Sequence, residues 1–182
     1  FSGLTQRLRT AKTERDFAES YIELTEWHVR LEHSNEPGLL ATVQALLVDL
    51  RKDFGCWVMT EYPQWMGGVK EGRPLLSVDV VKQYLAPNVG GSSVMFIVLD
   101  CLRMDQWKVI APLLMPYFEM EESYHYSILP TATPYCRNAI FSGKFPDNLH
   151  EDYGEKISLL GGEGGANDCE EELLEAHLKE LC

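Results

Sequence analysis

A threonine and an aspartate stand where a hydroxyl and a carboxylate can take part in phosphate chemistry. Thr133 precedes Pro134, and the short amphipathic pattern that follows ends at Ser142 and Gly143. Proline suits the first helical position, so Thr133 is predicted to be a helix N-cap. A hydroxyl there lies at the positive end of the helix dipole, which favours an alkoxide or an anionic phosphate. The alternative interpretation is an ordinary helix cap.

The aspartate, Asp100, follows the continuous apolar run 94–99, which is typical of a strand buried on both faces of a parallel sheet. Ligands of open α/β sheets bind beyond the carboxyl ends of the strands, so we expect Asp100 and Thr133 to approach one crevice. A carboxylate there is a hard ligand for a divalent metal, and a metal lowers the pKa of a coordinated hydroxyl. The alternative is that Asp100 caps the next turn, with Arg103 as its ion partner.

The elements that must position these residues are predicted from hydrophobic periodicity. Residues 13–66 carry apolar side chains at three- and four-residue steps with a break at 35–38, which predicts an antiparallel helical hairpin. Strands are then predicted at 94–99 and 124–129, and helices at 104–117 and 134–141. The helix at 104–117 should form a right-handed crossover between the two strands. The expected fold class is mixed α+β: a helical hairpin or bundle, followed by a partial α/β domain with a mainly parallel sheet.

The composition limits which classes of function are open to the chain. Its 182 residues are 45% hydrophobic and can bury a core, and its net charge is −12. That charge disfavours broad binding to nucleic-acid backbones, although it leaves room for a local phosphate site. The five cysteines include no C-x-x-C pair, which favours free thiols in a reducing cytoplasm. The longest apolar run is too short to span a bilayer, and Phe1 at the start suggests an excised segment.

Two motifs give the sequence a family resemblance. They are residues 98–107 (VLDCLRMDQW) and residues 129–133 (LPTAT), which run on to Phe145 and Pro146. Together they resemble the PglZ branch of the alkaline phosphatase superfamily, and most closely the PorX-type two-component response regulators. The resemblance extends upstream to helices that carry Trp27, Trp57, Tyr62 and Trp65. It implies a helical bundle or linker domain over residues 1–76 and the amino-terminal part of a PglZ domain over residues 77–182.

The resemblance also implies a chemistry for particular side chains. Members of the superfamily hold two metals, usually zinc, beside a hydroxyl nucleophile that is itself metal-bound. The matching positions are Asp100 as a metal ligand and Thr133 as both ligand and nucleophile, with Thr131 as the runner-up for the nucleophile. Asn138 and Arg137 are expected to face the phosphate, and the alternative for Arg137 is an ordinary surface residue. These roles are implied by the family and await a structure.

The sequence departs from the family pattern in its later metal ligands. The histidines downstream of Thr133 are His150 and His177, and His177 lies in an acidic helix that looks exposed. Neither has the family's metal-binding context, so we expect this chain to be unable to complete a two-zinc site alone. We expect it to resemble the middle of a longer parent protein, which carries the missing ligands and a receiver domain.

The function implied by the resemblance is that of a cytoplasmic signalling protein. Its PglZ domain would be a zinc-dependent phosphodiesterase for a phosphorylated small molecule, nucleotide or oligonucleotide, and the parent would regulate type IX secretion, with a homodimer as a further expectation. The alternative is a dimerisation and protein-binding module for a transcription factor or secretion component, with weak or no catalysis. A third interpretation is an α/β regulatory domain without metal, which applies if Asp100 and Thr133 lie far apart.

Overall fold

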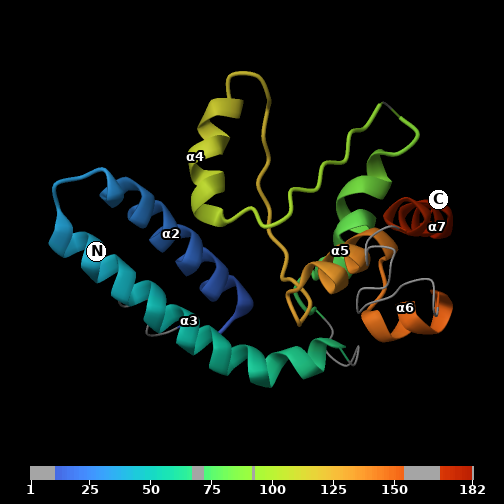
Figure 1. Cartoon of the computed structure of the whole chain (residues 1–182), viewed down its shortest axis with the longest axis horizontal. Helices are drawn as coiled ribbons and strands as arrows, with labels where there is room; N and C mark the ends of the chain where they lie inside the picture. Colours follow the sequence, from blue (N-terminus) through green and yellow to red (C-terminus); the bar gives the residue numbers. More distant parts are fainter. Residues whose placement is uncertain (1–10, 67–71, 92, 154–168, 182) are drawn as a thin grey trace, which may run out of the picture. The chain divides into compact units, whose positions relative to one another are not determined.

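Helices are the main elements of the computed structural model, which describes residues 11–66, 72–91, 93–153 and 169–181 (Figure 1). The chain divides into two compact units, Phe1–Arg73 with Cys101–Glu121, and Pro74–Asp100 with Glu122–Cys182. The first unit contains α2 (Glu14–Glu32), α3 (Pro37–Met66) and α4 (Met104–Leu114). The second contains the short helical turns η1 (Ser77–Asp79), η2 (Val81–Leu85) and η3 (Ala86–Asn88), and the helices α5 (Thr133–Ser142), α6 (Pro146–Tyr153) and α7 (Glu170–Leu181). None of the described helices has both the length and the apolar character of a membrane span.

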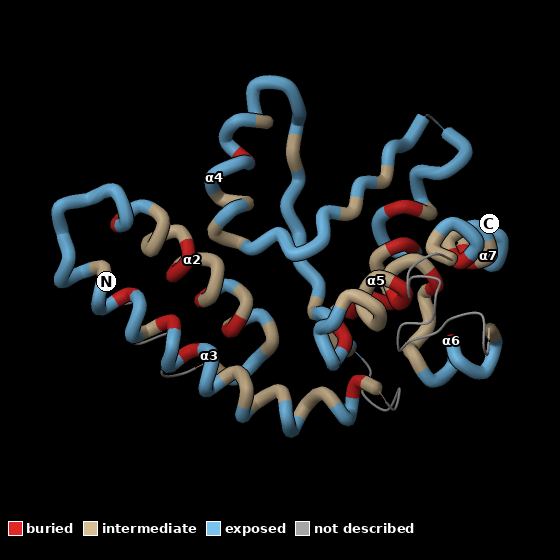
Figure 2. The backbone as a smooth tube through the Cα atoms, viewed as in Figure 1, coloured by how far each residue is buried: buried red, intermediate tan, exposed pale blue. Residues whose placement is uncertain are grey.

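The pairing of α2 with α3 forms the core of the first unit. α2 begins with a capping box, in which Thr13 Oγ1 accepts from the Asp16 N–H (3.2 Å) and Asp16 Oδ2 accepts from the Thr13 N–H (3.0 Å). Hydrogen bonds from the Lys12 backbone and from Thr13 hold the pKa of the Asp16 carboxyl below its usual value. The buried residues of the core cluster between the two helices are Phe17, Leu24, Leu31, Val43, Leu47 and Leu50, and buried positions are red on the backbone tube of Figure 2.

An aromatic cluster extends this core along α3. The ring centroids of Phe17 and Trp57 lie 5.1 Å apart, and those of Trp57 and Trp65 lie 5.4 Å apart. The Trp57 indole N–H donates to the Lys12 carbonyl over 3.1 Å, which satisfies the polar atom of a large packed ring. The aromatic residues of the predicted helices therefore serve packing.

Helix α4 packs against α2, although the sequence predicted that it would join the α/β part of the chain. Lys108 Nζ lies 3.0 Å from Glu26 Oε1 of α2, and the Lys108 side chain is only 16% exposed. The start of α4 is fixed by Gln106, whose Oε1 accepts from the Arg103 N–H over 3.0 Å. Helix α4, which begins four residues after Asp100, thus belongs to the first unit together with α2 and α3.

The mainly parallel sheet predicted from the sequence is wrong for the residues that the structure describes. Residues 94–99 are extended but pair with no described strand, and several of their side chains are exposed, with Met95 at 83%. The β-pairing found in the described ranges is an isolated parallel bridge between Leu76 and Tyr126. A continuous apolar run indicates a tendency to be buried, whereas a strand also needs a neighbouring backbone to accept its hydrogen bonds. The described fold is therefore helical, with extended connections.

The second unit is built around α5. Its residues Ala139 and Ser142 are buried, and α7 and α6 pack against the helix. Leu149 of α6 and Leu173 of α7 share a small apolar cluster. Gly143 ends α5 with a positive φ of 68°, and its N–H donates to the Ala139 carbonyl over 3.0 Å. This is the stop that the sequence predicted for the helix.

Candidate functional site

Thr133 and Asp100, which the sequence predicted to approach one another, are hydrogen-bonded. The Thr133 hydroxyl donates to Asp100 Oδ2 over 3.2 Å, and both residues belong to the second unit. The two side chains do not meet at a sheet edge. Asp100 follows the extended residues 94–99, and Thr133 is the first residue of α5. Their proximity is a structural fact, whereas their metal-binding and catalytic roles stay predictions.

The position of Thr133 in its helix differs by one residue from the prediction. Ala132, with φ −92° and ψ 145°, is the N-cap of α5. Its carbonyl accepts hydrogen bonds from the N–H groups of Tyr135 and Cys136, each at 3.0 Å. The Thr133 hydroxyl is therefore not needed as a cap, and it donates to Asp100.

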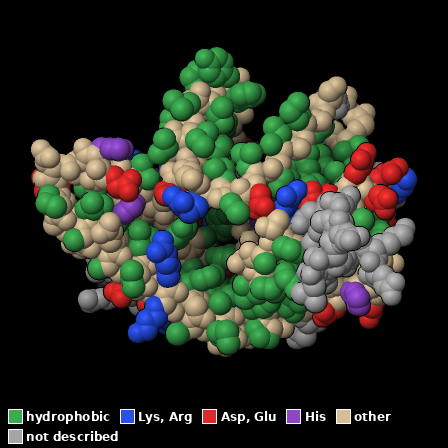
Figure 3. All heavy atoms as spheres, viewed as in Figure 1, with side chains coloured by type: hydrophobic (Ala, Val, Ile, Leu, Met, Phe, Trp, Pro, Cys, Tyr) green, Lys and Arg blue, Asp and Glu red, His purple; other side chains and the backbone are tan. Residues whose placement is uncertain are grey.

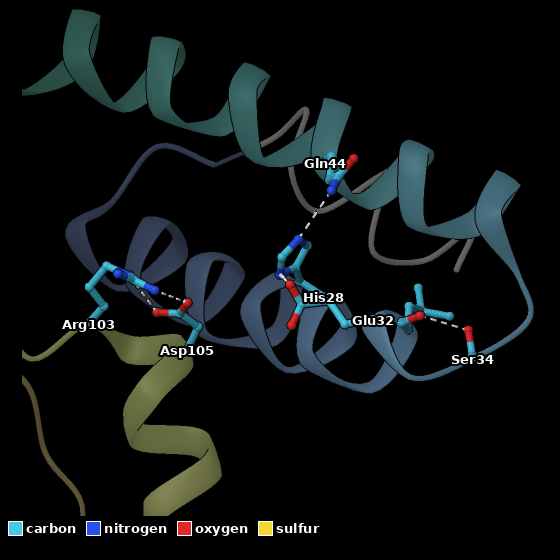
Figure 4. Close-up of polar contacts among 7 residues, drawn as sticks. His28, Glu32, Ser34, Gln44, Arg103 and Asp105 are labelled. Carbon is cyan, nitrogen blue, oxygen red and sulfur yellow. Dashed lines mark hydrogen bonds and ion pairs between the residues drawn. The ribbon is translucent and has the colours of Figure 1, made fainter.

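Arg103, the alternative ion partner considered for Asp100, binds Asp105 within the first unit (Figure 4). Its Nε and Nη2 donate to the two carboxylate oxygens over 3.0 and 2.7 Å. This pairing raises the pKa of the Arg103 guanidinium and lowers the pKa of the Asp105 carboxyl. The same view shows His28 between Gln44 and Glu32, with its Nε2 3.4 Å from Gln44 Nε2.

Arg137 lies beside the Thr133–Asp100 pair. Its Nη1 is 3.8 Å from Asp100 Oδ2, and its Nη2 donates to Glu170 Oε2 of α7 over 2.5 Å. Its Nε is buried and has no hydrogen-bond partner in the described part of the chain. The contact of Glu170 with Arg137 was not predicted, because the acidic first turn of a helix does not reveal which distant cation it will bind.

Two neighbours on α5 complete the surroundings of this pair. Asn138 is only 1% exposed, so its amide lies inside the packing of the unit, and its predicted contact with a phosphate stays a prediction. Burial raises the pKa of the Cys136 thiol, and the nearby Asp100 carboxylate raises it further. The thiol donates to the Ile128 carbonyl over 3.4 Å. Burial and the Asp100 carboxylate therefore both favour the neutral form of this thiol.

Comparison with protein families assigns both parts of the chain. Residues 79–180 match the BREX system PglZ alkaline phosphatase-like domain. The chain belongs to this PglZ family. Residues 1–66 match the PorX response regulator linker domain, as the resemblance implied. A search of curated proteins found no match. The Asp100–Thr133 pair lies in the PglZ match, whereas α2 and α3 lie in the linker match.

Membership in an alkaline phosphatase-like family makes a metal the expected companion of the PglZ residues. The Asp100 and Thr133 oxygens are 3.2 Å apart, close to the edge of about 3.3 Å in a zinc tetrahedron with bonds of about 2.0 Å. This separation is that of their hydrogen bond and would also suit two ligands of one metal, so their role as ligands stays a prediction. The described residues contain no group of three or more His, Cys, Asp or Glu that could hold one.

The two histidines downstream of Thr133 belong to no group of three or more metal-ligating side chains in the described residues. His177, expected on an exposed helix, is instead 7% exposed and packs its ring against Gly143. Its Nδ1 is 3.1 Å from the Phe141 carbonyl, so the ring joins α7 to the end of α5. His150 is exposed on α6. Further ligands for a two-metal site are therefore not evident in the described PglZ residues.

Proposed function

We propose that the PglZ segment serves zinc-dependent hydrolysis of phosphodiesters, such as nucleotides or oligonucleotides, with Asp100 as a metal ligand and Thr133 as the nucleophile. The observation that carries the proposal is the 3.2 Å hydrogen bond between these side chains at the start of α5. A hydroxyl that is free of a capping role and directed by a carboxylate is available for nucleophilic attack. The family match supplies the reaction class.

The residues act in a defined order in this proposal. Thr133 Oγ loses its proton to solvent and forms a bond to phosphorus, and the bond to the leaving alkoxide breaks as that oxygen takes up a proton from water. Water then attacks the same phosphorus, which releases the phosphate product and restores the hydroxyl. The first turn of α5 stabilises negative charge near Thr133, and Arg137 supplies a cation beside it. Bound zinc supplies a lowered hydroxyl pKa and stabilisation of charge on the attacking and leaving oxygens.

The direct test is hydrolysis of bis-p-nitrophenyl phosphate by a longer form of the protein that carries the further ligands. We expect turnover that requires zinc, disappears with a chelator and returns when zinc is restored. A longer form that binds zinc stoichiometrically but does not cleave any diester would contradict the proposal.

For the 182-residue chain alone, we expect weak zinc binding and negligible diester hydrolysis. Two oxygen ligands do not enclose a metal pair, and an open site loses much of the charge stabilisation that drives phosphoryl transfer. Isothermal titration with zinc and inductively coupled plasma analysis of the purified chain measure this. Tight stoichiometric zinc would show that the ligand set has been misjudged.

Control of the site by signalling forms the second part of the proposal. α4 lies within the PglZ match but packs on α2 of the linker match. Asp100 is joined to α4 by residues 101–103, and in this proposal signalling acts on the site through that short connection. We place this control in a cytoplasmic response regulator of type IX secretion.

The contact between α4 and α2 is expected to depend on Lys108. Glu26→Gln removes one carboxylate from beside the Lys108 ammonium, whose side chain is only 16% exposed, so we expect a loss of about 1–2 kcal/mol in the free energy of unfolding. Urea denaturation measures this loss. Glu19→Gln, which removes the far more exposed pair with Arg15, is the matched control and should have little effect. Equal losses in the two variants would show that α4 is not held by this pair.

A protein-binding and dimerisation module is the second candidate, and exposed apolar side chains favour it. Figure 3 shows hydrophobic side chains over α4, and exposed ones in and just after this helix include Leu113, Tyr117 and Phe118. Such surfaces commonly mark interaction sites. If the longer form dimerises or binds a transcription factor or secretion component without hydrolysing diesters, this function replaces the catalytic one.

A further inference from the structure

We infer that Glu170 is a positioning residue that holds Arg137 away from Asp100 and thereby keeps the Asp100–Thr133 pair available to a metal. This inference rests on the proposed function. The two contacts of the guanidinium are unequal: Arg137 Nη2 donates to Glu170 over 2.5 Å, whereas Nη1 lies 3.8 Å from Asp100 Oδ2. Arg137 therefore stands between two carboxylates and is bound mainly to Glu170.

The strength of the Glu170 contact follows from its surroundings. The Glu170 side chain is 17% exposed, and a partly desolvated charge-assisted hydrogen bond is stronger than one in open water. The Asp100 side chain is 41% exposed, so water screens its attraction for Arg137 more effectively. The difference in burial explains why Arg137 is drawn toward α7.

Glu170 is itself fixed by the packing of α7. Leu173 is buried beside Leu149, and His177 locks the next turns of the helix to Phe141 and Gly143. A carboxylate at the first residue of α7 is also favoured by the helix dipole. Glu170 is therefore placed by the packing of α7, and the longer Arg137 side chain has both carboxylates within 4 Å.

Removal of the Glu170 charge would release Arg137 toward Asp100. A guanidinium and a carboxylate form a two-bond pair when nothing else holds the guanidinium, and Arg137 Nε is a buried donor without a partner in the described residues. Once paired in this way, Asp100 would have to give up Arg137 before it could bind a metal. Loss of a positioning partner of a metal ligand commonly costs about 10–100-fold in metal affinity.

The first test follows the Arg137 guanidinium by NMR in the 182-residue chain labelled with ¹⁵N-arginine, without metal. Asp100→Asn should shift the Arg137 Nε and Nη signals only slightly in the wild-type background and several-fold more in the Glu170→Gln background. Glu171→Gln, which removes an exposed neighbouring charge from the same helix, is the matched background and should behave as wild type. Equal shifts in all three backgrounds would overturn the inference.

The second test measures zinc affinity by isothermal titration in the longer form of the protein that carries the further ligands, because the 182-residue chain alone is expected to bind zinc only weakly. Glu170→Gln should weaken zinc binding by about tenfold, Glu171→Gln should not, and adding Arg137→Gln to Glu170→Gln should recover most of the loss. No recovery in the double variant would overturn the inference. Absence of zinc binding in every variant would count against the proposed function, while the NMR comparison would still decide the role of Glu170.

Discussion

Thr133→Ala is expected to lower phosphodiester hydrolysis by the zinc-loaded longer protein by about 1,000-fold or more, because it removes the proposed nucleophile. The loss should appear in kcat/KM for bis-p-nitrophenyl phosphate. Since Ala132 and not Thr133 is the N-cap of α5, the substitution removes no helix cap, and the free energy of unfolding should change by less than about 1 kcal/mol. An inactive and fully folded variant is therefore the expected result.

Two further variants identify the hydroxyl. Thr133→Ser keeps a hydroxyl within reach of Asp100 and should retain a measurable rate. Thr131→Ala should retain a substantial part of the activity, because Thr131 precedes α5 and its exposed hydroxyl makes no hydrogen bond within the described residues. If Thr131→Ala is inactive and folded while Thr133→Ala is active, the nucleophile is Thr131. If both remain active, attack by a metal-bound water becomes the better mechanism.

Gly143→Ala is expected to lower the free energy of unfolding by about 2–4 kcal/mol, the largest effect on stability that we expect from a single methyl group. Gly143 has a φ of 68°, which side chains other than glycine rarely adopt. An added Cβ would also overlap the His177 ring. Urea denaturation of the 182-residue chain, followed by circular dichroism, measures the loss.

Gly55→Ala is the matched control for this prediction. Gly55 lies inside α3, and a Cβ there would meet nothing within 4 Å. Alanine is the better helix former, so this variant should gain up to about 1 kcal/mol. In the His177→Ala background the overlap is absent, so adding Gly143→Ala to His177→Ala should cost only the positive φ. An unchanged unfolding free energy in Gly143→Ala would show that His177 does not pack on this glycine.

Local sequence signals predicted the helical parts of this protein well. The apolar spacing of Phe17, Leu24 and Leu31 marks the face of α2 that packs on α3. Gly143 marks the end of α5 because the left-handed conformation there strongly favours glycine. These signals depend on only a few neighbouring residues, and they are therefore legible in a single sequence.

The errors concern properties that depend on distant parts of the chain. The apolar run 94–99 indicated a sheet, but no described segment supplies the paired backbone that a strand requires. His177 was expected to be exposed because its neighbours are acidic, whereas its own position on α7 faces Phe141 and Gly143. The partnership of Glu170 with Arg137 joins residues 33 positions apart and leaves no mark in either local sequence.

The prediction of the candidate site was correct for the proximity of its two side chains and wrong for the N-cap. The strand-end placement of Asp100 and the helix start at Thr133 predicted that their side chains would approach one another, and the structure places them 3.2 Å apart. The N-cap was misplaced by one residue, because proline is tolerated at the second helical position as well as the first. Because Ala132 is the N-cap, the Thr133 hydroxyl does not cap the helix and donates its hydrogen bond to Asp100 instead.

The central claim is that Thr133 forms the bond to phosphorus, and one measurement addresses it directly. The zinc-loaded longer protein is mixed with bis-p-nitrophenyl phosphate, quenched in acid within milliseconds, digested and analysed by tandem mass spectrometry. We expect a nitrophenyl-phosphoryl or phosphoryl adduct on the peptide that contains Thr133, with fragment ions that place it on this residue. An adduct on Thr131, or efficient turnover with no protein adduct at any quench time, would contradict the account.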